Sequence, residues 1–144
     1  MTQETTQSGW REVEHTADAG IEAWGPDLSS FLRAAGQGFI ELLVDPSTVR
    51  RRRTRQIEVS EADAETLLVS WLEEILLALE MDRLAPAAVE VTDADEWSAR
   101  GTLHGETLDE DRHEVRTVVK AVTYHGLDVH REDGLLRARV IVDI

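Results

Sequence analysis

Apolar residues recur every three or four positions in two stretches of the chain, which predicts two amphipathic helices. The first predicted helix covers residues 26–45, has Asp27 as its N-cap and stops at Asp45-Pro46. The second covers residues 60–82, where Ser60 and Asp63 resemble a capping box. The predicted buried faces are Leu28, Phe31, Leu32, Ala35, Phe39, Leu42 and Leu43 in the first helix, and Leu67, Leu68, Trp71, Leu72, Ile75, Leu76 and Leu79 in the second.

Shorter stretches between turn residues predict strands. Two of them flank the bend "HTADAG", and others are expected in residues 47–59, 87–93 and 96–108. The chain is therefore expected to form one α+β domain, in which a mostly antiparallel sheet of about seven strands packs with two helices. Residues 1–9 are expected to be a disordered or loosely held N-terminus, and residues 10–144 the domain.

The clearest predicted hairpin joins residues 113–130 to residues 134–144 through a turn at Asp133-Gly134. If these two residues form the turn, the numbers of paired residues sum to ~267 throughout the hairpin. This register places Tyr124 opposite Asp143 and Asp128 opposite Arg139, with Lys120 on the face of Asp143. The opposite core face would carry Ala121, Thr123, His125, Leu127, Val129, Leu136, Ala138, Val140, Val142 and Ile144.

Oxygen ligands for a divalent cation are a candidate chemistry at the end of the last predicted strand. Asp143 lies beside Ile144, whose α-carboxylate is expected to supply a second negative charge where the sequence stops. Hard divalent cations prefer several such oxygens, and Asp18 in the "HTADAG" bend is the best third candidate. The alternative is that Asp18 caps a turn and Asp143 is only solvated. His15 and His125 are either further ligands or hydrogen-bonded structural residues.

Composition narrows the function classes. The formal net charge of −14 argues against independent nucleic-acid binding and favours cations or a basic partner surface. The chain has no Cys, no apolar run long enough to cross a membrane and no apolar signal-peptide core, so a cytoplasmic protein is expected. Its cations are 14 Arg and one Lys, Lys120, and the run from Arg50 to Arg55 is either a solvated loop or a contact for phosphate or an acidic partner.

Four segments resemble the archease family in their order and spacing. They are "EHTADAGIEAWG", "LLVSWLEEILLALE", "VKAVTYHGLDV" and the closing "VIVDI". The elements "KAVTYH" and "DI" are the specific ones, whereas a leucine-rich helix alone is weak. The resemblance extends from Glu14 to Ile144 and implies a small α+β protein that is an accessory factor and not itself an enzyme.

The resemblance also implies a partner and a site. The family activates the RtcB-type RNA ligase of tRNA splicing and RNA repair, promoting guanylylation of the ligase and multiple turnover. The implied metal ligands are Asp18, Asp143 and Ile144, with calcium seen in family structures and magnesium or manganese as alternatives. Lys120, Tyr124, His15 and His125 would line the tip or contact the partner. The net charge of −14 and the run from Arg50 to Arg53 are departures that the resemblance does not explain.

Two other functions remain open at this point. One is a metal-dependent hydrolase built on Asp18, Asp143 and a histidine, although the sequence shows no recognisable nucleophile or base pair. The other is a metal-independent protein-binding or chaperone-like module that uses the arginine run and the acidic faces. Phosphoester turnover by the isolated protein would favour the hydrolase, and chelator-insensitive capture of many partners would favour the module.

Overall fold

The computed structural model describes residues 7–14 and 19–144 of the 144-residue chain. Within these residues the expected α+β class is confirmed, with two α-helices and eight strands that pair antiparallel throughout. Helix α1 spans Leu28–Leu43 and helix α2 spans Ala64–Asp82. The first strand already begins at Gly9, while the expectation of a loose N-terminus over residues 1–9 stays a prediction.

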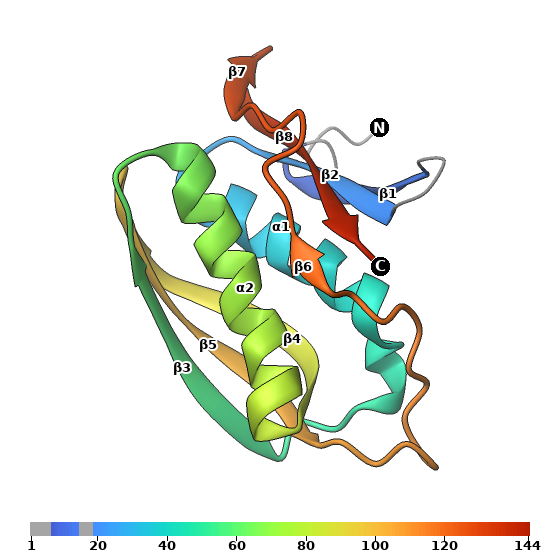
Figure 1. Ribbon diagram of the computed structural model, residues 1–144. Coiled ribbons are helices and arrows are strands. Elements are labelled where there is room, and N and C mark those ends of the chain that lie inside the picture. Colours follow the sequence, from blue (N-terminus) through green and yellow to red (C-terminus); the bar gives the residue numbers. More distant parts are fainter. Residues whose placement is uncertain (1–6, 15–18) are drawn as a thin grey trace.

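The strands divide into two sheets, a division that the sequence pattern did not indicate. The larger sheet has the order β1-β2-β8-β6, with β7 also paired to β8, and the smaller has the order β3-β5-β4 (Figure 1). The larger sheet consists of β1 (Gly9–Glu14), β2 (Ala19–Gly25), β6 (Ala121–Val122), β7 (His130–Glu132) and β8 (Leu135–Asp143). The smaller consists of β3 (Arg53–Ser60), β4 (Leu84–Ala94) and β5 (Ser98–Thr107), and a short 3-10 helix, η2, spans Pro46–Thr48.

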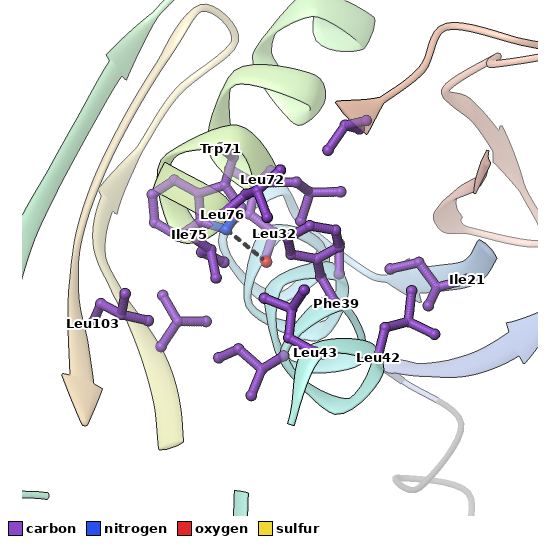
Figure 2. Close-up of a cluster of buried hydrophobic side chains, with 14 of the residues drawn as sticks. Ile21, Leu32, Phe39, Leu42, Leu43, Trp71, Leu72, Ile75, Leu76 and Leu103 are labelled. Carbon is purple, nitrogen blue, oxygen red and sulfur yellow. Dashed lines mark hydrogen bonds between the residues drawn. The ribbon is translucent and has the colours of Figure 1, made fainter. Parts of the chain in front are cut away.

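The two helices connect the sheets around one hydrophobic core. Helix α1 packs on β1 and β2 of the larger sheet and on β4 of the smaller, while α2 lies across the smaller sheet and beside β6 (Figure 1). The apolar faces predicted for both helices form this core, except that Leu28 and Leu79 are only partly buried. The buried Trp71 Nε1 of α2 donates to the Leu32 carbonyl of α1 at 3.0 Å, which fixes the helices against each other (Figure 2).

Two glycines in the middle of α1 allow this close packing. A Cβ on Gly36 would lie 2.7 Å from a methyl carbon of Val89 and 3.1 Å from Trp71 Nε1. A Cβ on Gly38 would lie 2.9 Å from the indole of Trp10. Glycine therefore costs helix propensity but lets a strand side chain and two tryptophans reach the helix backbone. The sequence Gly36-Gln37-Gly38 therefore serves the packing of this helix.

Local hydrogen bonds explain where both helices begin. Asp27 caps α1 as predicted: its carboxylate accepts from the Ser30 N–H at 2.8 Å, and the Ser30 hydroxyl completes a capping box. Helix α2 differs from the prediction, because its N-cap is Asp63 and not Ser60. The Asp63 carboxylate accepts from the Thr66 N–H at 2.8 Å.

Neither helix is long and apolar enough to span a membrane, within the part of the chain that the structure describes.

Candidate metal centre

The end of β8 brings Asp143 to an exposed position at the edge of the larger sheet. Strand β2 pairs with β8 so that Ala19 faces Val142 and Gly20 faces Ile141. Val142 is fully buried, and side chains alternate along a strand, so Asp143 points to the outer face of the sheet. Asp143 is exposed, and Ile144 beyond it is 47% exposed. Asp18 and His15 were also predicted to belong to this site, and both lie outside the described residues.

Strand β6 supports the end of β8 from the other side. Ala121 pairs with Asp143 and Val122 pairs with Val142. The Lys120 N–H also donates to the Asp143 carbonyl at 2.7 Å. The predicted pairing of Tyr124 with Asp143 is therefore wrong. Near the turn the prediction holds, since His130 pairs with Arg137 as the register required.

A second turn between β6 and β7 explains the shift in register. The Leu127 N–H donates to the Tyr124 carbonyl at 3.0 Å, and Gly126 has a φ of 64° at the third position of this turn. A left-handed residue at that position is typical of a type II turn. The loop removes an odd number of residues, three, from the predicted pairing, so β6 presents the opposite faces to those expected. The dipeptide His125-Gly126 was the signal that the sequence analysis missed.

This shift moves two predicted tip residues away from Asp143. Because Ala121 shares the face of Asp143, Lys120 and Val122 occupy the other face, and the expected placement of Lys120 is wrong. Lys120 instead lines a cavity of about 290 Å³ together with Glu73 and Leu77 of α2. Its role in contacting a partner stays a prediction.

Tyr124 likewise lies towards α2. Its side chain is 54% exposed, and its pKa is raised by partial burial and then by the negative charges of Glu73, Glu61 and Asp63. His125 occupies the exposed turn, where its N–H donates to Thr123 Oγ1 at 3.2 Å. The structure therefore does not bring Tyr124 to Asp143, and the proposed ligand or contact role of His125 stays a prediction.

The outer face next to Asp143 carries ion pairs that the sequence analysis assigned differently. Asp128 precedes β7 and belongs to no strand, so the predicted Asp128–Arg139 pair is wrong, and Arg139 pairs with Glu22 of β2 on the other side of β8. Asp128 instead lies 3.3 Å from the Nδ1 of His130. Glu22 accepts from Arg11 Nε at 2.6 Å and lies 3.6 Å from Arg137. Although burial opposes it, these arginines hold the pKa of Glu22 below its usual value.

At the end of β8 the described residues supply one carboxylate suited to a hard cation, Asp143, which is too few ligands for a metal centre. Among residues 7–14 and 19–144, no three His, Asp or Glu side chains are grouped to hold a metal ion. Asp143 contributes carboxylate oxygens at an open position, which is the ligand type that calcium, magnesium and manganese prefer. Any metal centre here needs ligands besides Asp143, and the sequence candidates are Asp18 and the carboxylate of Ile144.

A buried ionic cluster that sequence reasoning missed organises the chain before β6. The Glu106 carboxylate, 5% exposed, accepts from the Arg50 N–H at 2.8 Å, from Arg112 at 2.7 Å and from His113 Nε2 at 2.8 Å. These donors lower the pKa of Glu106 to about 2. His113 is also buried, and its Nδ1 accepts from the Asp109 N–H at 3.0 Å. Because Glu106 belongs to β5 while Arg50 lies before β3, only the folded chain brings these two residues together.

Part of the arginine run from Arg50 to Arg55 has a structural role. Arg55 forms ion pairs with Glu74, at 3.4 Å, and with Asp82 of α2. Arg53 donates to Thr107 Oγ1 at 3.1 Å. The bonds fasten β3 to its neighbours, whereas Arg51 and Arg52 are exposed. A purely solvated loop therefore does not describe this run.

Taken together, the fold and the exposed carboxylate define a small α+β protein whose candidate chemistry is oxygen ligation at a sheet edge. Comparison with known proteins agrees in both length and architecture. The profile described as "Archease protein family (MTH1598/TM1083)" matches residues 10–144, so the chain belongs to the archease family.

Individual relatives support this membership over almost the whole chain. "Protein archease" of Methanopyrus kandleri is 38% identical over 138 residues, covering 94% of this chain and 99% of that protein. The solution structure of protein 1598 from Methanobacterium thermoautotrophicum is 35% identical, with a TM-score of 0.77 and coverage of 94% and 99% of the two chains. The crystal structure of a Thermotoga maritima archease, titled "possible chaperone", is 19% identical with a TM-score of 0.62 over 92% and 94% of the chains, and shows the fold alone.

Proposed function

We propose that this protein is an accessory factor that activates an RtcB-type RNA ligase in tRNA splicing or RNA repair. It would promote transfer of GMP to the ligase and so sustain multiple turnover. The observation that carries the proposal is membership of the archease family across residues 10–144. In this proposal the protein is not an enzyme, acts in the cytoplasm and does not bind nucleic acid by itself.

A divalent cation held by Asp18, Asp143 and Ile144 would be the working part of the factor. Ala19 pairs with Val142, and each of these two residues adjoins one of the aspartates in the chain. This pairing supports the assignment of both aspartates to one site.

The protein's own residues would hold and present the cation. Calcium, magnesium and manganese all suit carboxylate oxygens, and the bound ion would stabilise the charge that develops on phosphate during GMP transfer. Strands β2 and β6 pair with β8 from either side and keep Asp143 at the edge of the sheet. Its exposed position allows the end of β8 to approach the active site of a partner.

The direct experiment measures guanylylation of the RtcB-type ligase from the same genome, with and without this protein. Wild-type protein should accelerate the reaction, while Asp18→Ala and Asp143→Asn should lose the acceleration. Asp93→Asn is the matched control, because Asp93 is also an exposed strand residue but lies on β4 in the other sheet. Full stimulation by folded Asp18→Ala or Asp143→Asn protein would contradict the metal-centre proposal.

A terminal extension tests the contribution of Ile144. Two glycines and six histidines added after Ile144 would replace its carboxylate by a neutral peptide carbonyl, which is a poorer ligand for a hard cation. We expect this extension to weaken calcium binding and ligase stimulation, whereas the same extension at the N-terminus should leave both intact. Equal calcium affinity and stimulation of the two tagged proteins would remove Ile144 from the ligand set.

A chaperone-like module is the second candidate, because the Thermotoga maritima archease, which shares this fold, is described as a possible chaperone. Such a module would bind many unfolded or partly folded proteins without a metal. Suppression of aggregation of an unrelated unfolded protein, unaffected by chelator and by Asp143→Asn, would support this candidate over the ligase activator.

A further inference from the structure

An apolar groove runs along the exposed side of α2, away from the outer face that carries Asp143. We call it the α2 groove and define it by Leu76, Leu77 and Glu80 on one wall and by Val115, Val118 and Lys120 on the other. It combines two adjoining cavities of about 200 and 290 Å³, which share Leu76 and Glu80. The segment that leads into β6 supplies the residues of the second wall.

The apolar side chains of this region are unusually exposed. Leu77 is 40% exposed, Val115 is 42% exposed and Val118 is 74% exposed. Met81, one helical turn beyond Leu77 on α2, is also 74% exposed and extends the apolar surface. Single exposed apolar residues are ordinary, but a contiguous group in a hollow is typical of an interaction surface.

Charge indicates what kind of segment fits this surface. Glu73 and Glu80 are both exposed on α2, and neither carboxylate forms an ion pair within residues 7–14 and 19–144. They are seven residues apart, which places them on the same helix face at a separation of about 10.5 Å. Lys120, on the opposite wall, adds one positive charge, and Arg83 in the adjoining cavity is offset by Glu110, 3.4 Å away. A partner with apolar side chains between two cations at this spacing would match the groove.

We propose that the α2 groove docks a basic amphipathic helix of the RtcB-type ligase. The helix would insert its apolar face between Leu77 and Val118 and place Lys or Arg residues two turns apart against Glu73 and Glu80. Docking of one amphipathic helix into an apolar groove is a common recognition mode, and the acidic carboxylates select for a basic helix. This inference rests on the proposed function, because it names the surface by which the ligase is held.

The groove and the candidate metal centre share one structural element. Lys120, Ala121 and Val122 all line the groove, and Ala121 also pairs with Asp143. The Lys120 N–H also donates to the Asp143 carbonyl. A ligase helix in the groove would therefore lie against the strand that supports Asp143, so docking would hold the end of β8 near the ligase. The groove supplies affinity, and the end of β8 supplies the effect on guanylylation.

The test separates these two contributions by titrating the ligase with each variant. Met81→Ser combined with Val118→Ser removes exposed apolar surface, and Trp97→Ser is the matched control, since Trp97 is 47% exposed on the loop between β4 and β5. Glu73→Gln combined with Glu80→Gln removes two charges from the groove. Glu12→Gln combined with Glu96→Gln removes two exposed charges elsewhere. Each titration yields the concentration for half-maximal stimulation, the maximal guanylylation rate and the dissociation constant.

Both groove variants should raise the dissociation constant and the half-maximal concentration by about tenfold, while the maximal rate at saturation stays unchanged. Binding of wild-type protein should weaken as salt rises, and binding of the Glu73→Gln and Glu80→Gln double variant should depend less on salt. Both control variants should bind like wild type. Asp143→Asn should show the reverse behaviour, with normal affinity and a reduced maximal rate.

Two outcomes would overturn the inference. Groove variants that bind and stimulate like wild type would show that the ligase docks elsewhere. Control variants that lose as much affinity as the groove variants would show a nonspecific effect of apolar area or charge. If wild-type protein neither binds the ligase nor stimulates it, the proposed function itself fails, which is distinguishable from both outcomes because no variant is involved.

Discussion

Glu106 shows how much a single buried carboxylate contributes when it has three donors. Arg50 comes from the segment before β3, and Arg112 and His113 come from the loop after β5, so Glu106 at the end of β5 connects both segments to the sheet. A buried carboxylate without partners would be strongly unfavourable, whereas charge-assisted hydrogen bonds favour the ionised form. The low pKa of Glu106 reflects these bonds, and stability should therefore depend on pH.

We expect Glu106→Gln to lower the melting temperature by at least about 5 °C at pH 7, because it replaces three charge-assisted bonds by weaker ones. The folded-state pKa of about 2 lies below the ordinary value of 4.5, so the ionised carboxylate stabilises the fold above pH 4.5. This stabilisation is lost as the pH falls from 4.5 towards 2. Melting temperatures of both proteins at pH 7, 4 and 3 should converge on acidification. A constant difference between them would contradict the assignment.

Residue-scale chemistry was only partly predictable from the sequence. The Asp27 cap was predicted because its hydrogen bond spans three residues and depends on local conformation alone. The Glu106 cluster was not, since Arg50 and Glu106 are 56 residues apart and meet only when β3 pairs with β5. Lys120 attracted attention by composition, but its face could not be assigned correctly without the register of β6.

At the scale of elements, the start of α2 provides a test of local hydrogen bonding. Asp63→Ala should lower the melting temperature by about 3–6 °C, because it leaves the Thr66 N–H without its side-chain acceptor. Ser60→Ala should change it by less than about 1 °C, since Ser60 ends β3 and does not cap the helix. Thermal unfolding of both variants at neutral pH measures the difference. Equal destabilisation would restore the capping box expected from the sequence.

Prediction of elements succeeded where periodicity is local and failed where register depends on a loop. Both helices were predicted because their apolar stripes persist over several turns. The hairpin was predicted correctly next to Asp133-Gly134, yet the turn at Gly126 removed three residues from the pairing further away. Since strand faces alternate with every residue, that one unrecognised turn reversed the face of Lys120 relative to Asp143 and placed Tyr124 in the turn itself.

At the scale of the whole molecule, α1 explains why the strands form two sheets. Its residues contact β1 and β2 on one side and β4 on the other, with Gly36 and Gly38 allowing both approaches. No local pattern encodes this arrangement, because it depends on which strands meet the helix after folding. The end of β8 belongs to the larger sheet, whereas α2 packs on the smaller sheet and also contacts β6 of the larger one (Figure 1).

Calcium should stabilise the whole fold if the proposed metal centre exists. A ligand that binds only the folded state at 100 times its dissociation constant adds about 2.7 kcal/mol, which raises the melting temperature of a domain of this size by roughly 5–15 °C. We expect such a shift for wild-type protein and none for Asp143→Asn. With a net charge of −14, weak cation binding elsewhere is expected, and Asp93→Asn controls for it by making the same change on β4. Scans with calcium at constant ionic strength, with and without chelator, measure the effect. A shift of equal size in wild-type and Asp143→Asn protein would show that calcium binds elsewhere and that Asp143 is not a ligand.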